Sequence, residues 1–307
     1  MPNRYQRTIR NKVSLAGIGL HTGIQSTLNI NPAENNSGII FRRIDLLENP
    51  VIPADVDYVI DTNRGTMLEN NGVRIHTVEH VLAALSGLGV DNVTIELTGP
   101  EPPIMDGSSM PFIEAINKVG IVDQSEIQDV FKITESIQFD DLDNCIEISI
   151  LPYEQFKITF FMDYGLQNFG LQYASVENVE KEFENEIAPA RTFGLLSEVV
   201  QLKQNGLIKG GSLENAVIIV DKKVDKSEQK IFSKLFGLNI KSNFKNDEVL
   251  NQGGLHFENE PVRHKVLDLI GDMSLFGKPI IGHVIAKRSG HKTNIEFVKK
   301  LRRIVKS

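Results

Sequence analysis

The stretch that most constrains the fold is residues 260–272, EPVRHKVLDLIGD, which the sequence predicts to be a buried helix. Pro261 suits the first turn of a helix, because its missing N–H costs no hydrogen bond there. Apolar side chains recur at helical spacing through the segment: Val262, Val266, Leu269, Ile270 and Met273. A helix with such a stripe packs its apolar side against the core, so we expect this segment to be central to the fold.

The same helix carries a pair of side chains with a spacing suited to metal binding. His264 and Asp268 are four residues apart, which places both on one face with their Cβ atoms about 5–6 Å apart. Asp272 continues this polar row. Alone, such a pair is more often solvated or salt-bridged than bound to a metal ion, so a further ligand has to be sought elsewhere.

A second helix is expected to begin near Thr77, within the stretch HTVEH at residues 76–80. A catalytic zinc ion uses three protein ligands of the His, His and carboxylate type and keeps one position open for water. His80 together with His264 and Asp268 would supply that set, and Glu79 would stand beside the metal as a base.

Residues 76–80 also match the H-x-x-E-H pattern of inverted zinc proteases, in which both histidines bind zinc. Thr77 is the natural N-cap, however, so we expect His76 just outside the helix, where the four-residue helical relation to His80 fails. We predict that His76 packs or forms an outer hydrogen bond. A protease, and a two-domain binding module with a structural metal or none, stay as alternatives.

The composition bounds the class of protein. The net charge of −7 argues against a nucleic-acid binder with a broad basic face. The single cysteine, Cys145, excludes an internal disulfide framework and fits a reducing compartment; its alternating surroundings predict a thiol in the core. Since the chain has no apolar run of ~18 residues and no secretory signal, we expect a soluble cytoplasmic protein.

The order of elements predicts two α+β domains, residues 1–127 and 128–307, each a β-sheet layered with helices. The first has short strands, the helix near Thr77, a strand at 93–97 and a helical stripe at 112–119. Apolar periodicity lapses around residues 122–129. In the second, strands are expected at 131–137, 145–150, 156–161, 216–220 and 280–287, and helices at 176–187, 193–202 and 260–272.

Several loop residues are candidates for supporting chemistry. His291 follows a strand in a basic turn; an imidazole titrates near neutrality, so it can act as a general acid if the turn faces the metal, with Asp272 holding it protonated. The Thr192 hydroxyl can donate to an oxyanion, or else cap a helix. The loop at residues 210–212, GGS, can bring backbone close to a ligand, or simply form a tight turn. For His21, in a glycine-flanked loop, physical reasoning assigns no role.

The last residues are basic and amphipathic: Lys299, Lys300, Arg302, Arg303 and Lys306. Their default role is solubility. Contact with an anionic substrate, or transient proximity to a membrane surface, is the alternative interpretation.

Seven stretches together resemble the family of UDP-3-O-acyl-N-acetylglucosamine deacetylases, zinc enzymes of the committed step of lipid A biosynthesis. They are GIGLHTG (17–23), HTVEHVLAALSGLGVDN (76–92), PIMDGSS (103–109), ARTFG (190–194), GGS (210–212), FENEPVRHKVLDLIGD (257–272) and SGH (289–291). They occur in the family's order over almost the whole chain. The resemblance implies two similar α+β domains with the active site at their interface.

By motif position, the resemblance implies Zn²⁺ on His80, His264 and Asp268, with Glu79 as general base and His291 as general acid. It implies further roles for other residues: Thr192 as oxyanion donor, Lys265 and Asp272 as supporting catalytic groups, and Phe193, Leu196, Gly211 and Arg288 at the substrate.

The substrate implied is a UDP-linked acylated amino sugar. Its 2-acetamido group would be hydrolysed to acetate and a free amine, with the acyl chain in a passage near residues 195–218 and the diphosphate near Arg288. Residues 163–170 depart from the family pattern, so no contact is carried over to them. Some relatives carry a fused dehydratase domain, and such a domain beyond residue 307 stays an open alternative.

Overall fold

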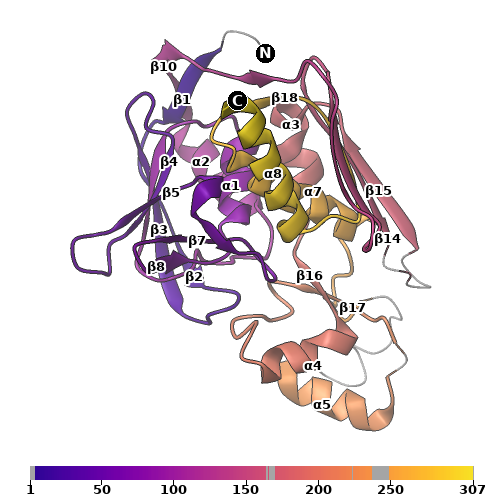
Figure 1. Ribbon diagram of the computed structural model, residues 1–307. Helices are drawn as coiled ribbons and strands as arrows, with labels where there is room; N and C mark the ends of the chain where they lie inside the picture. The colour runs from indigo at the N-terminus through magenta and orange to yellow at the C-terminus, as the bar shows by residue number, and fades with distance from the viewer. Residues whose placement is uncertain (1–3, 164, 166–169, 223, 237–248, 307) are drawn as a thin grey trace.

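The computed structural model describes residues 4–163, 165, 170–222, 224–236 and 249–306. Two mixed β-sheets enclose a layer of helices, with α1 (Glu79–Gly87) and α7 (Glu260–Ser274) at its centre (Figure 1). The α+β class predicted from the sequence, with sheets layered with helices, is therefore confirmed.

The first sheet has the strand order β2-β3-β9-β4-β5. Its strands are β2 (Val13–Ile18), β3 (Gln25–Pro32), β4 (Ile39–Arg43), β5 (Val51–Pro53) and β9 (Val93–Leu97). All neighbours are antiparallel except β4 and β9, which are parallel.

The second sheet repeats this arrangement with the order β12-β13-β18-β14-β15, where only β14 and β18 are parallel along that path. Its strands are β12 (Ile137–Asp141), β13 (Ile146–Leu151), β14 (Phe156–Asp163), β15 (Leu171–Val176) and β18 (Ile280–Lys287), and β11 (Phe131–Lys132) also pairs with β18.

The registers of the two sheets also match. Ile95 on β9 lies between Ile30 and Phe41, just as Val284 on β18 lies between Ile150 and Ile158. All six side chains are buried. The two sheets therefore present equivalent apolar faces to the helices.

The helices occupy equivalent places in the two halves. α1 precedes β9 and α7 precedes β18, whereas α2 (Met110–Val119) and α8 (His291–Lys306) follow those strands. α1 and α7 touch at the backbone: a Cβ added to Gly271 would lie 2.2 Å from the carbonyl oxygen of Glu79. Only a residue without a side chain allows this approach.

The two halves differ in what is inserted before the central helix. The first inserts η1 (Val56–Tyr58) and a small sheet of β6 (Val59–Asp61), β7 (Met67–Asn70) and β8 (Val73–Ile75). The second inserts α3 (Val179–Glu182), the π-helical turn η2 (Phe183–Ile187), β16 (Phe193–Leu195), α4 (Leu196–Gln204), β17 (Val217–Ile219) and α5 (Lys226–Phe236). The α4–α5 part projects as a separate lobe at the bottom of Figure 1.

Where the periodicity was expected to lapse, residues 121–127 form β10 (Ile121–Ile127), which pairs with β1 (Tyr5–Ile9). Most side chains of β10 are partly or fully exposed, so the strand lacks the alternation that identifies a half-buried one. We propose that the domain boundary lies at residue 128, because β10 pairs with the N-terminal strand and β11 pairs with β18.

Three local predictions in the second half were wrong. Cys145 is exposed and has φ 54°, in the turn that joins β12 and β13, so it is no core thiol. The strand expected at 131–137 is divided between β11 and β12. The helix expected from Phe193 begins only at Leu196, because residues 193–195 pair with β17.

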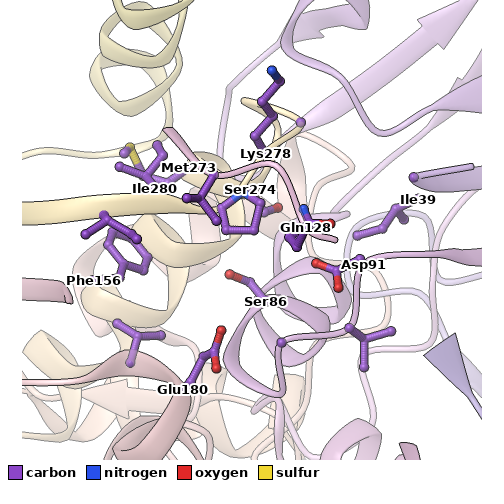
Figure 2. A pocket seen from close by; sticks show the side chains of 18 of the residues that line it. Ile39, Ser86, Asp91, Gln128, Phe156, Glu180, Met273, Ser274, Lys278 and Ile280 are labelled. Atoms are coloured by element: carbon purple, nitrogen blue, oxygen red, sulfur yellow. The ribbon is translucent and has the colours of Figure 1, made fainter. Parts of the chain in front are cut away.

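A cavity of ≈ 580 Å³ lies between the two halves, and none of the predicted site residues is among its described lining. The last turns of α1 and α7 line it with Ser86 and Met273, and the equivalent strands β4 and β14 contribute their first residues, Ile39 and Phe156 (Figure 2). Matching elements of both halves therefore form its walls.

Candidate active site

Three potential metal ligands converge where α1 meets α7. His80 lies in the first turn of α1, and His264 and Asp268 lie one turn apart on α7. One ligand atom from each residue can be chosen so that all three lie within 4.8 Å of one another, and all three residues are buried. The metal-ligand set expected from the sequence is thus brought together by two segments 184 residues apart, from His80 to His264.

The chemistry of these donors fits a divalent cation such as zinc. Burial, followed by the neighbouring His264, lowers the pKa of His80 to about 3, so its imidazole is neutral and able to bind a metal. Nδ1 of His264 lies 3.0 Å from the carbonyl oxygen of Ala190, which orients the ring so that Nε2 faces Asp268 Oδ1 at 3.4 Å. Nδ1 of His80 is buried and has no hydrogen-bond partner among the described residues.

Asp268 is a buried carboxylate held in its charged form. Burial alone would raise its pKa, but the charge of Lys265, followed by the effects of His264 and His291, outweighs burial and holds the pKa well below its usual range. Lys265 Nζ lies 2.6 Å from Asp268 Oδ2. Two neutral imidazoles and one anion are the donor set of a catalytic zinc site.

Glu79 is the first residue of α1 and is buried beside the three ligands. Its Oε2 accepts a hydrogen bond of 3.0 Å from the backbone N–H of Thr66. Burial raises the pKa of Glu79 to about 7, since the opposing effect of His291 is partly cancelled by Asp272 and Asp268. A carboxyl group with this pKa can accept and release a proton near neutrality.

His291 is the first residue of α8 and faces Glu79 across the cluster. Its Nε2 lies 3.9 Å from Glu79 Oε1 and 3.8 Å from Asp268 Oδ2. Burial alone would lower the pKa of His291, but the charges of Asp272 and Asp268 and the hydrogen bond to Asp272 raise it to about 9. The imidazole is therefore protonated at pH 7.

Asp272 is the centre of a hydrogen-bond network behind His291. Its Oδ2 lies 2.9 Å from His291 Nδ1 and accepts a 2.9 Å bond from Asn294 Nδ2, while its Oδ1 accepts a 2.6 Å bond from Thr66 Oγ1. All three partners of the Asp272 carboxylate come from other parts of the chain. Sequence reasoning missed Thr66 and Asn294.

The segment before β16 passes next to the ligands. The ring centroids of Phe193 and His264 are 6.2 Å apart and nearly perpendicular, and Lys265 Nζ lies 5.5 Å from the Phe193 centroid. The segment is tied to the start of α7 by Arg191, whose Nε donates to Glu260 Oε1 at 2.8 Å. The main-chain N–H of Thr192 donates to Gly107 O at 2.7 Å.

A cavity of ≈ 80 Å³ opens beside this segment. Its lining includes Thr192, Phe193 and Gly211, three of the residues predicted at the substrate or the oxyanion, with apolar walls from Leu202 and Ile208. Leu196 is not among the lining residues that the structure describes. It is fully buried in an apolar cluster behind Val199 and Ile218, which do line the cavity.

Arg288 lies just after β18 with φ 57°, and its Nη1 is 4.0 Å from Asp163 Oδ2. No contact in the described part of the chain connects it to the three ligands. Of the segment 163–170, residues 164 and 166–169 lie outside the described residues, so the structure does not bear on that part.

His76 follows β8 and donates its backbone N–H to Pro100 O at 2.9 Å. It lies outside α1, as expected, and does not belong to the triad of ligands. The predicted N-cap was wrong: Thr77 has φ 53° and turns its hydroxyl to Glu101 Oε1 at 2.7 Å. Residue Val78 occupies the cap position, without a side-chain hydrogen bond.

Glu101 anchors the glycine-flanked loop that contains His21. The carboxylate is buried and accepts the backbone N–H groups of His21 and Thr22, as well as the hydroxyls of Thr22 and Thr77. His21 Nε2 lies 3.1 Å from Arg64 O, and the residue lines the smaller cavity. The loop is thereby held against the start of α1.

A buried His, His and Asp set beside a carboxyl and an imidazole with shifted pKa values is the arrangement of a metal-dependent hydrolase. The chain matches the family model described as LpxC, UDP-3-O-acyl N-acetylglycosamine deacetylase, over residues 6–234 and 240–303. It belongs to this family, and the resemblance seen in the motifs is confirmed.

Similar proteins support the assignment across the chain. The UDP-3-O-acyl-N-acetylglucosamine deacetylase of Myxococcus xanthus is 41% identical over 303 residues, which is 98% of this chain and 87% of the relative. That of Chlamydia pneumoniae is 39% identical over 303 residues, 98% of each chain. The bifunctional enzyme LpxC/FabZ of Chlorobaculum tepidum is 44% identical over 300 residues, 97% of this chain.

The chain spans 64% of the length of that bifunctional relative and 65% of the one from Bacteroides thetaiotaomicron. Among the described residues, no helix combines the length and the apolar character needed to cross a bilayer.

Proposed function

We propose that this protein is a zinc-dependent amide hydrolase that removes the 2-acetyl group of UDP-3-O-(3-hydroxyacyl)-N-acetylglucosamine, the committed step of lipid A biosynthesis. The products are acetate and the free amine. The observation that carries the proposal is the convergence of His80, His264 and Asp268 beside Glu79 and His291. The names of the relatives supply the substrate.

His80, His264 and Asp268 would hold the ion, and three protein ligands are the number that catalytic zinc sites use. When bound, zinc supplies Lewis acidity, which polarises the amide carbonyl and acidifies water. Lys265 keeps Asp268 ionised at a distance of 2.6 Å.

Glu79 is the general base. Its pKa of about 7 leaves a large fraction of the carboxylate free to take the proton of the attacking water at neutral pH. The Thr66 N–H bonds Oε2, so Oε1, 3.9 Å from His291 Nε2, is the oxygen directed into the site.

His291 is the general acid. An amine leaves an amide only once it has been protonated, and an imidazolium with a pKa of about 9 carries that proton at pH 7. Nδ1 is held by Asp272, so the proton is donated from Nε2, which faces the ligands. Asp272 acts by orienting and charging the ring.

Thr192 donates its hydroxyl to the developing oxyanion. Loss of one such donor typically reduces the rate by about 10²–10³. Thr192 shares the smaller cavity with Phe193, whose ring stands next to that of His264.

The acyl chain enters the apolar cavity beside Phe193 and Gly211, with Leu196 supporting its wall from behind. Each buried methylene contributes ~0.8 kcal/mol, so six would contribute roughly 5 kcal/mol. Arg288 meets the diphosphate of the substrate, which requires it to exchange its exposed neighbour Asp163 for the ligand.

We also propose that the protein works in the cytoplasm and approaches a membrane surface transiently to reach a lipid-linked substrate. Nucleic acid is not a proposed partner. A dehydratase domain fused beyond residue 307 is a further proposal; the names of the two longer relatives, which join LpxC and FabZ, support it.

The experiment that tests the function is metal analysis combined with acetate release from the UDP-sugar. We expect one zinc ion per chain and acetate release that chelation abolishes and added zinc restores. A zinc-loaded, folded protein that releases no acetate from this substrate would remove the proposed reaction.

A further inference from the structure

We infer that Thr66 is a positioning residue that links the base Glu79 to the acid His291, through its backbone N–H on one side and its hydroxyl on the other. The inference rests on the proposed function, because it assigns Thr66 to the same reaction. Neither a motif nor the spacing of the sequence pointed to this residue.

The contacts of Thr66 reach both proton-transfer groups. Its N–H donates to Glu79 Oε2 at 3.0 Å, and its Oγ1 donates to Asp272 Oδ1 at 2.6 Å. The hydroxyl also lies 3.4 Å from His291 Nδ1. Thr66 is fully buried, so water does not compete for these bonds.

The local backbone is shaped for this double contact. Thr66 directly precedes β7, and its carbonyl oxygen accepts the N–H of Val78, one residue before α1. Gly65 comes just before it, and a Cβ there would lie 3.0 Å from Glu79 Oε1. The small sheet inserted in the first half thus places Thr66 against residues from α1, α7 and α8.

The hydroxyl has a specific task at Asp272. Oδ2 already serves His291 and Asn294, and the Thr66 hydroxyl is the partner that the structure gives to Oδ1. A buried carboxylate oxygen that loses its donor is left unsatisfied, which favours rotation of the carboxylate. Such rotation would turn Oδ2 away from the ring of His291. The proton on Nε2 would then be directed less well at the leaving nitrogen.

The two functions of Thr66 can be separated by substitution. Thr66→Val keeps the shape and the backbone N–H that binds Glu79 but removes the hydroxyl. Thr66→Ser keeps the hydroxyl and loses only a methyl group. Comparison of these variants therefore tests the bond to Asp272 by itself.

With the zinc-loaded protein, we expect T66V to keep one zinc ion per chain and a KM within about twofold of the original. Its kcat should fall about 10- to 100-fold, the loss expected for a hydrogen bond to a charged group. T66S should keep kcat within about threefold. A T66V protein with unchanged kcat, or a T66S protein as impaired as T66V, would overturn the inference.

A double substitution distinguishes positioning from general packing. If Thr66 acts through Asp272, T66V should reduce kcat much less in an Asp272→Asn background than in the original protein. Equal reductions in the two backgrounds would contradict the link. If T66V does not fold, Thr66→Ala supplies the same comparison with T66S.

A crystal structure of zinc-loaded T66V provides a readout independent of activity. We expect the Asp272 carboxylate or the His291 ring to be rotated away from their 2.9 Å contact. An unchanged contact would refute the inference. If the original protein lacked deacetylase activity, the proposed function would fail, whereas this structural test of Thr66 would still give an answer.

Discussion

The two halves of the molecule share one strand order and one helix placement but supply different parts of the site. The first half contributes Glu79 and His80 from the first turn of α1, together with Thr66 from its inserted sheet. The second contributes His264, Asp268 and Asp272 from α7, and His291 from the start of α8. The comparison teaches that a repeated scaffold can carry a chemistry that neither copy possesses.

The segments inserted before the central helix also differ between the two halves. In the first half, the insert before the central helix is a small sheet, and Thr66, directly before its strand β7, bonds Glu79 and Asp272. In the second, the insert includes β16, β17, α4 and α5, and lines the smaller cavity. In the proposed reaction, one insert would support proton transfer and the other would shape a cavity for substrate.

The largest expected effect comes from removing the anionic ligand of the second half. Asp268→Ala should lose most of the bound zinc and with it the deacetylation, because Asp268 is the anion of the proposed ligand set. Metal analysis after gel filtration measures this. Asp163→Ala removes a partly exposed carboxylate at the end of β14; it is the matched control and should retain zinc. Full occupancy in Asp268→Ala would exclude Asp268 as a ligand.

Removal of the base from the first half should leave the metal in place. Glu79→Gln is expected to keep zinc and to lower kcat by about 10²–10⁴, the usual contribution of a general base. Glu69→Gln on β7, whose carboxylate pairs with Arg74, is the control and should have ordinary kcat. Zinc loss in Glu79→Gln would mean that Glu79 serves the ion.

The dependence of kcat/KM on pH should report one group from each half. Glu79 must be deprotonated, so activity should rise as pH passes about 7; His291 must be protonated, so it should fall as pH passes about 9. His291→Gln should have low activity without the high-pH decline. A decline at high pH that persists in this variant would assign it to another group.

A substitution at the contact between the halves should have a smaller effect, but it should lower both stability and rate. In Gly271→Ala, the new Cβ would lie 2.2 Å from Glu79 O, so α1 must shift. Overpacking of this kind costs about 1–3 kcal/mol in unfolding free energy. Thermal unfolding and kcat would be compared with Gly253→Ala, where nothing lies within 4 Å. An unchanged melting temperature would contradict the close contact between α1 and α7.

The smallest effect is expected at the larger cavity, which both halves line and the proposed reaction does not use. Ser86→Ala removes a hydroxyl from its wall and should alter kcat by less than about twofold. Steady-state kinetics with the UDP-sugar would check this. A large fall in kcat would mean that the two cavities are coupled.

Sequence reasoning succeeded where a single segment carries the information. The helix at 260–272 was confirmed almost to its ends, because Pro261 and a strong apolar period define it locally. The strands at 93–97 and 280–287 were predicted with the observed bounds, since they combine β-branched residues with clear turns on either side.

Sequence reasoning failed where a contact with a residue far away in the sequence determines the role of a side chain. Thr77 looks like a helix cap, but Glu101 takes its hydroxyl. Thr66 and Asn294 look like ordinary polar residues, and their importance depends on Asp272, which is 206 and 22 positions away. Leu196 has the apolar character of a substrate contact but packs behind the cavity wall. No local pattern encodes such pairings.

The absence of a side chain at Gly271 has a consequence for how this protein can diversify. The main chain of Glu79 lies so close to residue 271 that any residue larger than glycine there would displace the segment that carries Glu79 and His80. A substitution at position 271 is therefore tolerated only as far as that segment can move.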